Sequence, residues 1–342
     1  MDRPDAHYGG GMSPGHASAQ EGSAADAQGP ENAPVRLALG HDPLDRRADL
    51  RTGDWSAVPG PRVLLLLDHE GAAAISRGPD RSARLVAVPG EADARPPSTA
   101  RETLDILLGA DESGRLWCGR VVARDHAIVP ADVEWAGLRE VALRLPAEER
   151  SIFAEFLALA NWHATHVRCP RCGAATVVAG LGWWRTCPED GSEHYPRTDP
   201  AVIALLLDDE GNALLGRQTR WPEGAFSTLA GFVEPGESAE SAVAREIAEE
   251  VGLHVTGARY VGSQPWPFPA SLMLGYHATI SGVRPEPQPD GVEIAEARWI
   301  SRAELPALCE SREVRLPGRL SIAHHLIRLW YGQDLPPEWC RW

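Results

Sequence analysis

The sequence predicts an α/β protein of two or three domains. Its 342 residues suffice for that number, and the 43% of hydrophobic residues is ordinary for a globular chain. The apolar run 62-RVLLLLD-68 is strand-like, and residues 255–263 form a second predicted strand. A helix is predicted after Ser238, where apolar residues repeat at helical spacing. In the first domain, strand-like runs such as 62–68 favour an α/β or α+β organisation.

The predicted helix after Ser238 has one buried side. The Ser238 side chain can cap its N-terminus, because serine oxygens accept hydrogen bonds from the first free backbone N–H groups. Val243, Ile247 and Val251 follow at i, i+4 and i+8, so they lie in one stripe that faces a core.

The same helix carries a cluster of acidic residues. Glu246 precedes Glu249 by three residues and Glu250 by four, so all three project from one side. Like charges at this spacing cost a few tenths of a kcal/mol per pair unless a cation lies among them. The cluster is therefore either a solvated acidic face or a site for Mg²⁺ or Mn²⁺, which prefer carboxylate oxygens.

The residues around this cluster form a longer motif, GFVEPGESAESAVAREIAEEVGL, at 231–253. It reads Gly, five residues, Glu, seven residues, Arg-Glu, an aliphatic residue, any residue, Glu-Glu, any residue, Gly and an aliphatic residue. This motif resembles the signature of the Nudix hydrolases at every required position. The resemblance implies an α/β/α sandwich around a mixed sheet. It also implies hydrolysis of a nucleoside diphosphate linked to another group.

The resemblance also implies roles for single residues. Gly231 would make the turn into the helix, and the three glutamates would hold divalent cations. Arg245 would pair with Glu249 or Glu237 and orient them. The implied catalytic residues are Arg245, Glu246, Glu249 and Glu250.

Three of the six cysteines lie together, in the spacing of a zinc ribbon. Cys169 and Cys172 form one Cys-x-x-Cys turn, and Cys187 follows fifteen residues later. The residue three positions after Cys187 is Asp190, where a fourth cysteine is expected. Asp190 or His194 could complete the set of zinc ligands, and we favour Asp190 because its spacing matches.

Zinc is not the only interpretation of this segment. The ribbon could have lost zinc and depend on packing by Trp183 and Trp184. A closed set of four ligands would make the zinc structural, because it leaves no open position for chemistry. The remaining cysteines, Cys118, Cys309 and Cys340, are isolated and predicted to be reduced.

A second motif narrows the family. The segment 263-SQPWPFPASLM-273 cannot be a central strand, because proline lacks a backbone donor, and on composition it is a rigid surface loop. It resembles the signature loop of the NADH pyrophosphatase branch of the Nudix hydrolases. The order of zinc ribbon, 195-YPRTDPAVI-203, acidic motif and this loop agrees with that branch. The match extends from about residue 145 to 332.

This second resemblance implies further site residues. The Ala230 carbonyl and Glu293 would be additional ligands of the catalytic metal, with Glu296 as a local competitor of Glu293. Aromatic rings at Tyr195 and Phe232 would stack on the nicotinamide. The remaining residues implied to bind substrate are Gln264, Pro265, Trp266, Pro267, Phe268, Pro269, Ala270, Ser271 and Ala323.

The implied activity is metal-dependent hydrolysis of NADH, and of NAD, to nicotinamide mononucleotide and AMP. Removal of NAD caps from RNA by the same chemistry is the first alternative. A non-catalytic nucleotide-binding zinc-ribbon protein is the second, although its expected mark, an eroded glutamate cluster, is missing. The net charge of −15 argues against general nucleic-acid binding.

The predicted organisation has five parts. They are a disordered segment at 1–34, an N-terminal domain at 35–165, a zinc ribbon at 166–197, the Nudix domain at 198–332 and a tail at 333–342. No apolar run is long enough to span a bilayer, so we expect a cytoplasmic protein. The resemblance implies a homodimer, and the tail, with Trp339, is predicted to expose apolar groups that a partner could cover.

Overall fold

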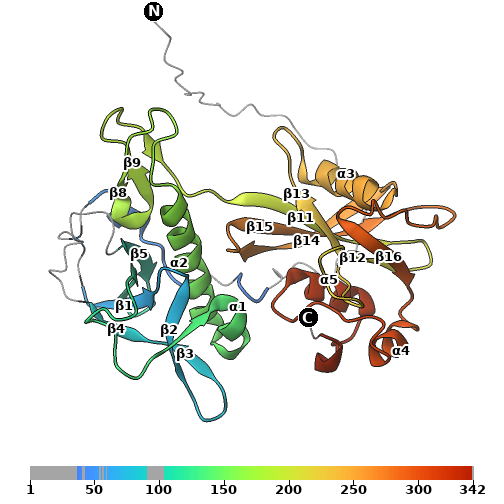
Figure 1. Cartoon of the computed structure of the whole chain (residues 1–342), viewed down its shortest axis with the longest axis horizontal. Coiled ribbons are helices and arrows are strands. Elements are labelled where there is room, and N and C mark those ends of the chain that lie inside the picture. Colours follow the sequence, from blue (N-terminus) through green and yellow to red (C-terminus); the bar gives the residue numbers. More distant parts are fainter. Residues whose placement is uncertain are drawn as a thin grey trace, which may run out of the picture. The chain divides into compact units, whose positions relative to one another are not determined.

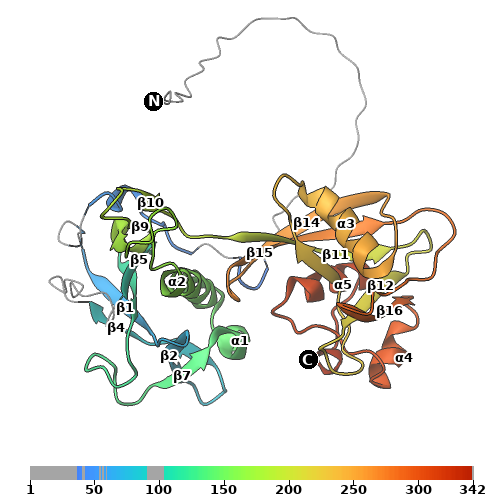
Figure 2. The same cartoon turned by 45° about the horizontal axis from the view of Figure 1, so that its top comes forward.

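The computed structural model describes residues 37–40, 43–53, 55, 58, 60–90 and 104–340 (Figures 1 and 2). The predicted disordered segment 1–34 lies outside these residues. No helix in the described part of the chain combines the length and the apolar character needed to cross a membrane. The domain boundaries proposed from the sequence remain predictions.

The first group of elements is a seven-stranded sheet with two helices. Its strands run in the order β3-β2-β1-β6-β5, and β4 and β7 pair with β1 and β2. The predicted strand at 62–68 is confirmed as β1. Leu65 and Leu67 of β1 pack in one core with Phe153 of α2, whereas Leu64 and Leu66 face a second core. The elements are β1 (Arg62–Leu67), β2 (Ala72–Arg77), β3 (Ala83–Leu85), β4 (Ala87–Gly90), β5 (Leu104–Ala110), β6 (Leu116–Val121), β7 (Glu134–Gly137), α1 (Leu138–Val141) and α2 (Ala147–Thr165).

The second group is a small antiparallel sheet of β8 (Val177–Ala179), β9 (Trp184–Thr186) and β10 (Glu193–His194). A buried network joins it to α2. Arg185 donates to Thr176 Oγ1 at 2.7 Å and to His163 Nδ1 at 3.1 Å, and the other ring nitrogen of His163 donates to the Gly182 carbonyl at 2.8 Å. Burial lowers the pKa of His163 to about 4, so the ring is neutral and can accept from Arg185.

The third group is a six-stranded sheet with three helices. Its strand order is β14-β15-β11-β12-β16, and β13 pairs with β11. The β11–β15 pair is parallel and the other pairs are antiparallel, so the sheet is mixed. The elements are β11 (Asp199–Leu207), β12 (Ala213–Gln218), β13 (Leu229–Phe232), α3 (Ala239–Val251), β14 (Gly257–Trp266), β15 (Ser271–Thr279), β16 (Ile294–Ile300), α4 (Leu305–Glu310) and α5 (Ile322–Tyr331).

Helices cover both faces of this sheet. Side chains alternate between the two faces along a strand. In β11, Val202 and Ala204 pack with Val243 and Ile247 of α3, whereas Ile203 packs with α5 on the opposite face. The predicted α/β/α sandwich and the predicted apolar stripe of α3 are therefore confirmed.

Two local predictions are wrong. Residues 263–273 are not a continuous loop, because β14 extends through Trp266 and a turn at 267–270 leads into β15. Pro265 is tolerated because β14 is an edge strand, where a missing donor leaves no central hydrogen bond unmade. Trp339 is not exposed. It is 6% accessible, packs edge-to-face on Tyr331 and accepts a hydrogen bond from Leu316 N through its carbonyl.

Candidate functional site

The strand β13 and the helix α3 position the acidic motif. Ser238 caps α3 as predicted, because its Oγ accepts from Ser241 N at 3.1 Å. Gly231 does not make the turn into the helix. It lies within β13 opposite Val202, and the tight turn falls at Gly236, whose φ is +86°. A Cβ at Gly231 would overlap the Glu246 carboxylate, so this glycine provides room for that group.

Arg245 holds three carboxylates at once. It makes two hydrogen bonds of 2.9 Å to Glu237, and one of 2.9 Å each to Glu246 and Glu249. It also donates to the Phe232 carbonyl at 2.9 Å, which links the helix to β13. The hydrogen bonds from Arg245 to Glu237 lower the pKa of Glu237 to about 2. Both predicted partners of Arg245 are thus bound, and Glu246 is a third.

Glu250 is the buried member of the cluster. Its side chain is 3% accessible, and neither carboxylate oxygen has a hydrogen-bond partner among the described residues. Burial raises its pKa to about 8, the neighbouring carboxylates of Glu246 and Glu293 add to the rise, and the nearby Ala230 backbone opposes it weakly. A buried carboxylate without a partner beside other carboxylates is suited to a divalent cation.

Glu293 rather than Glu296 faces this cluster. Its charge acts on both Glu246 and Glu250. Glu296 lies in β16 and pairs with Arg217 at 3.5 Å and Arg298 at 3.7 Å. Glu296 is thus already paired, whereas Glu293 lies near the cluster; its role as a metal ligand remains a prediction.

The loop that carries Glu293 is fixed by Asp290, a residue that sequence reasoning missed. One oxygen of Asp290 accepts the backbone N–H groups of Val292 and Glu293 at 3.1 Å, and of Ile294 at 2.9 Å. The backbone N–H of Asp290 donates to the Glu250 carbonyl at 3.1 Å. The Asp-Gly pair at 290–291 is a turn signal that could have identified it.

The two aromatic residues predicted to bind nicotinamide are both exposed. Phe232 ends β13 beside Arg245 and is 59% accessible, and Tyr195 is 61% accessible. The Tyr195 ring lies 6.1 Å from the Trp184 ring of the zinc ribbon. In the described part of a single chain, no recorded ring contact joins Tyr195 to Phe232.

The predicted substrate segment 264–271 divides into a buried and an open part. Gln264 is fully buried. Ala323, the predicted substrate residue in α5, is also buried. Pro267, Phe268, Pro269 and Ala270 line a cavity of about 680 Å³ together with residues of α2.

Two residues outside this segment hold its turn, and neither was predicted. Asn161 donates to the Pro267 carbonyl at 3.1 Å, and the Arg139 guanidinium lies 4.2 Å from the Phe268 ring centroid. No local motif identifies Asn161 or Arg139, because their partners lie more than a hundred residues away in the sequence.

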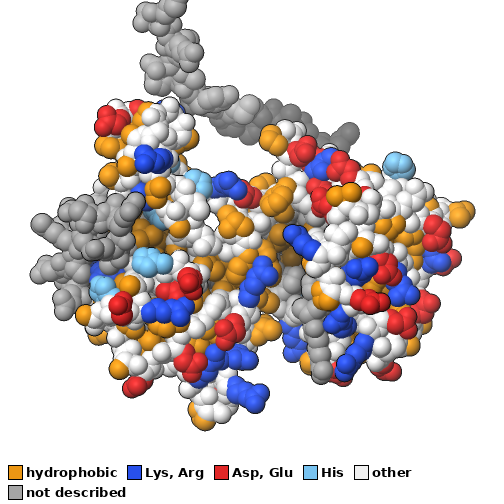
Figure 3. All heavy atoms as spheres, in the orientation of Figure 1, with side chains coloured by type: hydrophobic (Ala, Val, Ile, Leu, Met, Phe, Trp, Pro, Cys, Tyr) orange, Lys and Arg blue, Asp and Glu red, His pale blue; other side chains and the backbone are white. Residues whose placement is uncertain are grey.

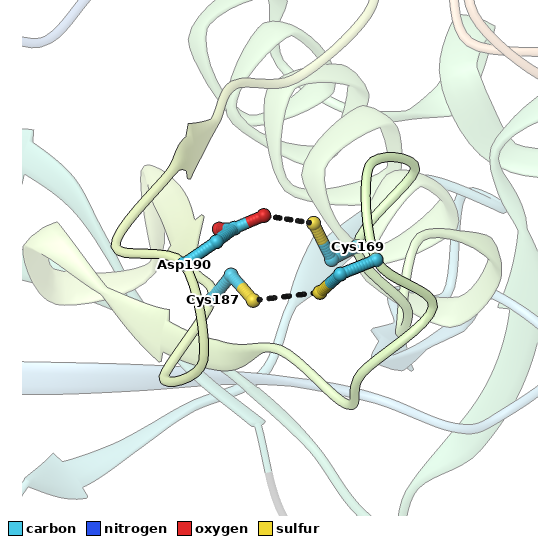
Figure 4. Close-up of side chains that lie close together, drawn as sticks. Cys169, Cys187 and Asp190 are labelled. Carbon is cyan, nitrogen blue, oxygen red and sulfur yellow. Dashed lines mark hydrogen bonds between the residues drawn. The ribbon is translucent and has the colours of Figure 1, made fainter.

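The cysteine turns bring four possible ligands together (Figure 4). The sulfur atoms of Cys169, Cys172 and Cys187 and an oxygen of Asp190 all lie within 4.8 Å of one another. Cys169 donates to Asp190 at 3.3 Å, and the other two sulfurs are 3.5 Å apart. Three thiols and a carboxylate in this arrangement fit a tetrahedral zinc ion. His194 is outside the group, and its Nε2 lies 3.0 Å from Ser192 Oγ.

Each pair of possible ligands lies on a tight turn. The N–H of Gly173 donates to the Cys169 carbonyl at 2.9 Å, and the N–H of Gly191 donates to the Cys187 carbonyl at 3.0 Å. Both glycines have positive φ, 78° and 70°, which other residues rarely adopt. The remaining cysteines, Cys118, Cys309 and Cys340, are free thiols as predicted.

Comparisons with known proteins agree with this architecture. The NUDIX domain family matches residues 197–317, and the NADH pyrophosphatase zinc ribbon domain matches residues 164–195. A protein from Mycobacterium bovis (strain BCG / Pasteur 1173P2), named NAD-capped RNA hydrolase NudC, is 39% identical over 308 residues, which cover 87% of this chain and 94% of that protein.

A human relative, named NAD-capped RNA hydrolase NUDT12, is 40% identical over 200 residues, 55% of this chain and 43% of that protein. The chain belongs to the Nudix hydrolases that carry an NADH pyrophosphatase zinc ribbon.

Proposed function

We propose that this Nudix hydrolase cleaves the pyrophosphate of NADH, and of NAD, to nicotinamide mononucleotide and AMP. The observation that carries the proposal is the buried carboxylate of Glu250 among Glu246 and Glu293. Such a site needs a cation, and a pyrophosphate needs a cation to be attacked by water. The names of the mycobacterial and human relatives support a substrate that contains NAD.

Mg²⁺ or Mn²⁺ would be held by the carboxylates of Glu246, Glu249, Glu250 and Glu293 and by the Ala230 carbonyl. When bound, the cation would neutralise the pyrophosphate and lower the pKa of the attacking water. Arg245 keeps two of these carboxylates in place through hydrogen bonds of 2.9 Å, so the chain itself orients the ligands. Phe232, exposed at the end of β13, would stack on the nicotinamide ring.

A NAD cap on RNA is the second candidate substrate, because both relatives are named for it. The exposed position of Phe232 allows the same stacking on a cap. On the face shown in Figure 3, basic and acidic side chains are interspersed, which does not favour long contacts with an RNA backbone. A cap needs few contacts beyond the pocket.

The decisive experiment is an assay of purified, zinc-loaded protein with Mg²⁺ or Mn²⁺ on NADH, NAD and NAD-capped RNA at equal concentrations. Mass spectrometry identifies the products. We expect nicotinamide mononucleotide and AMP from the free dinucleotides. Faster turnover of capped RNA would make the cap the principal substrate, and no cleavage of any of the three would contradict the proposal.

We also propose that Cys169, Cys172, Cys187 and Asp190 bind a structural zinc ion. The cluster of four ligand atoms supports Asp190 as the fourth ligand. Ser192 keeps Asp190 ionised, because its hydrogen bonds hold the Asp190 pKa below the usual range. Asp190→Ala should lower the zinc content more than His194→Ala, and the opposite order would exclude Asp190.

A cytoplasmic homodimer is the remaining part of the proposal. The exposure of both rings supports it, since a second subunit could bring its Tyr195 to the Phe232 of the first. Light scattering of the purified protein would measure the mass, and a monomer at all concentrations would contradict the dimer.

A further inference from the structure

A second cavity lies beside the helix α5, away from the residues of the carboxylate cluster. Its volume is about 320 Å³, and none of the glutamates of that cluster lines it. The polar residues around it are Gln264, Arg319, Ser321, His324, His325, Arg328 and Asp334.

The lining of this cavity is cationic in a strongly acidic protein. The chain has a net charge of −15, yet two arginines meet here with one acidic residue, Asp334. The two histidines add no charge at pH 7, because burial lowers the pKa of both rings. Asp334 is 3.3 Å from Arg328 and is almost fully exposed, so it neutralises the cavity only weakly. Arg319 has no hydrogen bond or ion pair with any residue that the structure describes.

One histidine of the cavity lacks a partner. The Nε2 atom of His325 is buried and makes no hydrogen bond with the described residues. The neighbouring histidines differ, because His324 bonds to the Pro317 carbonyl at 3.1 Å and His277 to the Leu326 carbonyl at 3.0 Å. Burial, followed by Arg328 and His324, lowers the pKa of His325 to about 4, so its ring is neutral at pH 7. A neutral ring can donate one hydrogen bond, and Nε2 has no acceptor among the described residues.

The start of α5 adds to the positive potential. This helix has ten residues and begins at Ile322, after Ser321, whose Oγ accepts from Ala323 N at 3.2 Å. Gln264 fixes its position, because its amide donates to the Leu320 carbonyl at 2.8 Å and accepts from Ile322 N at 2.7 Å. The wall of the cavity at the start of α5 is therefore tied to β14.

We propose that this cavity binds a phosphate group, with Arg319 and Arg328 as charge partners and His325 Nε2 as a hydrogen-bond donor. Guanidinium groups suit phosphate oxygens, and a volume of about 320 Å³ admits a phosphate or pyrophosphate. The group can come from a small free phosphate or from the backbone of a longer nucleotide. This site goes beyond the proposed hydrolysis. It shares only Gln264 with the residues implied to bind substrate, and none of the metal-binding glutamates lines it.

The test is calorimetric titration of zinc-loaded, full-length protein with pyrophosphate, without Mg²⁺ or Mn²⁺. We expect Arg319→Gln and His325→Gln each to weaken binding about tenfold, the effect of one lost charge-assisted hydrogen bond. Arg312→Gln is the matched control, since it removes an exposed arginine outside the cavity and should bind like wild type.

A parallel arm measures fluorescence anisotropy of a labelled, uncapped ten-nucleotide RNA with the same variants. Sensitivity of pyrophosphate binding to Arg319→Gln supports the site with a small phosphate as its ligand. If Arg319→Gln weakens only RNA binding, the site is supported and its phosphate comes from a nucleotide backbone. If neither ligand distinguishes Arg319→Gln from Arg312→Gln, the site is refuted. NADH hydrolysis is not read in either arm, so this failure is distinct from failure of the proposed function.

Discussion

The carboxylate cluster of α3 and the cysteine turns of the zinc ribbon are both sets of like groups held close together, but the chain supports them differently. The carboxylates project from a helix whose other side is buried in the core through Val243, Ile247 and Val251. The cysteine turns rest on short-range backbone hydrogen bonds, such as those from Gly173 and Gly191. The first site therefore has an apolar scaffold that is independent of any ion. The cysteine turns are held by backbone hydrogen bonds, and the Arg185–His163 network anchors only the sheet beside them.

This difference predicts different consequences of losing a metal. A structural zinc ion contributes its binding free energy directly to folding. At the carboxylate cluster an ion mainly offsets charge, because Arg245 and the core already hold the helix. Removing ligands should thus unfold the ribbon but inactivate the Nudix domain without unfolding it.

The largest effect is expected for Cys172→Ser in the ribbon. This change should release zinc and lower the free energy of unfolding on the order of 5 kcal/mol, part of the roughly 10–16 kcal/mol that a structural zinc supplies. Elemental analysis and thermal unfolding measure both. Cys340→Ser, which removes a thiol outside the cluster, should keep the zinc. Wild-type protein purified without zinc would contradict the ribbon assignment.

Glu250→Gln should show the opposite behaviour. It keeps the size of the side chain and removes the charge, so the protein should fold while kcat for NADH falls by at least about a hundredfold. Circular dichroism and product formation measure the two properties. Activity near that of wild type would refute the role of Glu250 in metal binding.

The same residue should make stability depend on pH when Mg²⁺ and Mn²⁺ are absent. Burial and the nearby carboxylates raise the folded-state pKa of Glu250 to about 8, from an ordinary value of 4.5. A raised carboxyl pKa means that the folded state is most stable relative to the unfolded state below about pH 4.5 and loses that stability as pH rises towards 8.

We expect a loss on the order of 2 kcal/mol between pH 5 and pH 8, where one pKa unit corresponds to about 1.36 kcal/mol. Urea unfolding at pH 5 and pH 8 measures it, in zinc-loaded protein without other divalent cations. Glu250→Gln should reduce the pH dependence, and added Mn²⁺ should restore stability at pH 8. An unchanged slope in Glu250→Gln would assign the dependence to other groups.

The sequence was informative where function depends on local spacing. The glutamates, Arg245 and the cysteine turns lie within short segments, so their mutual positions follow from helix and turn geometry. Gly231 was recognised as part of the motif, but the predicted reason, a turn into the helix, was wrong. The contact that requires a glycine is with Glu246, which belongs to a different element. The partners of the turn at 267–270 were missed for the same cause, as Asn161 comes from α2.

The contacts of Asp290 at the carboxylate cluster were also missed from the sequence, and they can be tested. Asp290→Ala removes the acceptor for the N–H groups of Val292, Glu293 and Ile294, so Glu293 should be less well fixed. We expect kcat to fall about tenfold at limiting Mg²⁺ and the Mg²⁺ requirement to rise. Asp290→Asn keeps an acceptor oxygen and should lose less. Equal activity of Asp290→Ala and wild type across Mg²⁺ concentrations would show that the loop holds Glu293 without Asp290.

The smallest effect is expected for Phe232, which lies beside the carboxylate cluster but supplies no ligand to it. If its exposed ring stacks on nicotinamide, Phe232→Ala removes a contact of about 1 kcal/mol, which corresponds to a roughly fivefold rise in KM for NADH. ADP-ribose shares the pyrophosphate but lacks the nicotinamide ring, so its KM should change little. The kcat values should persist for both substrates, because the Phe232 carbonyl that accepts from Arg245 belongs to the backbone and is retained. Equal losses on NADH and ADP-ribose would mean that Phe232 supports the strand rather than the base, and the preference for nicotinamide would then depend on the 264–271 segment.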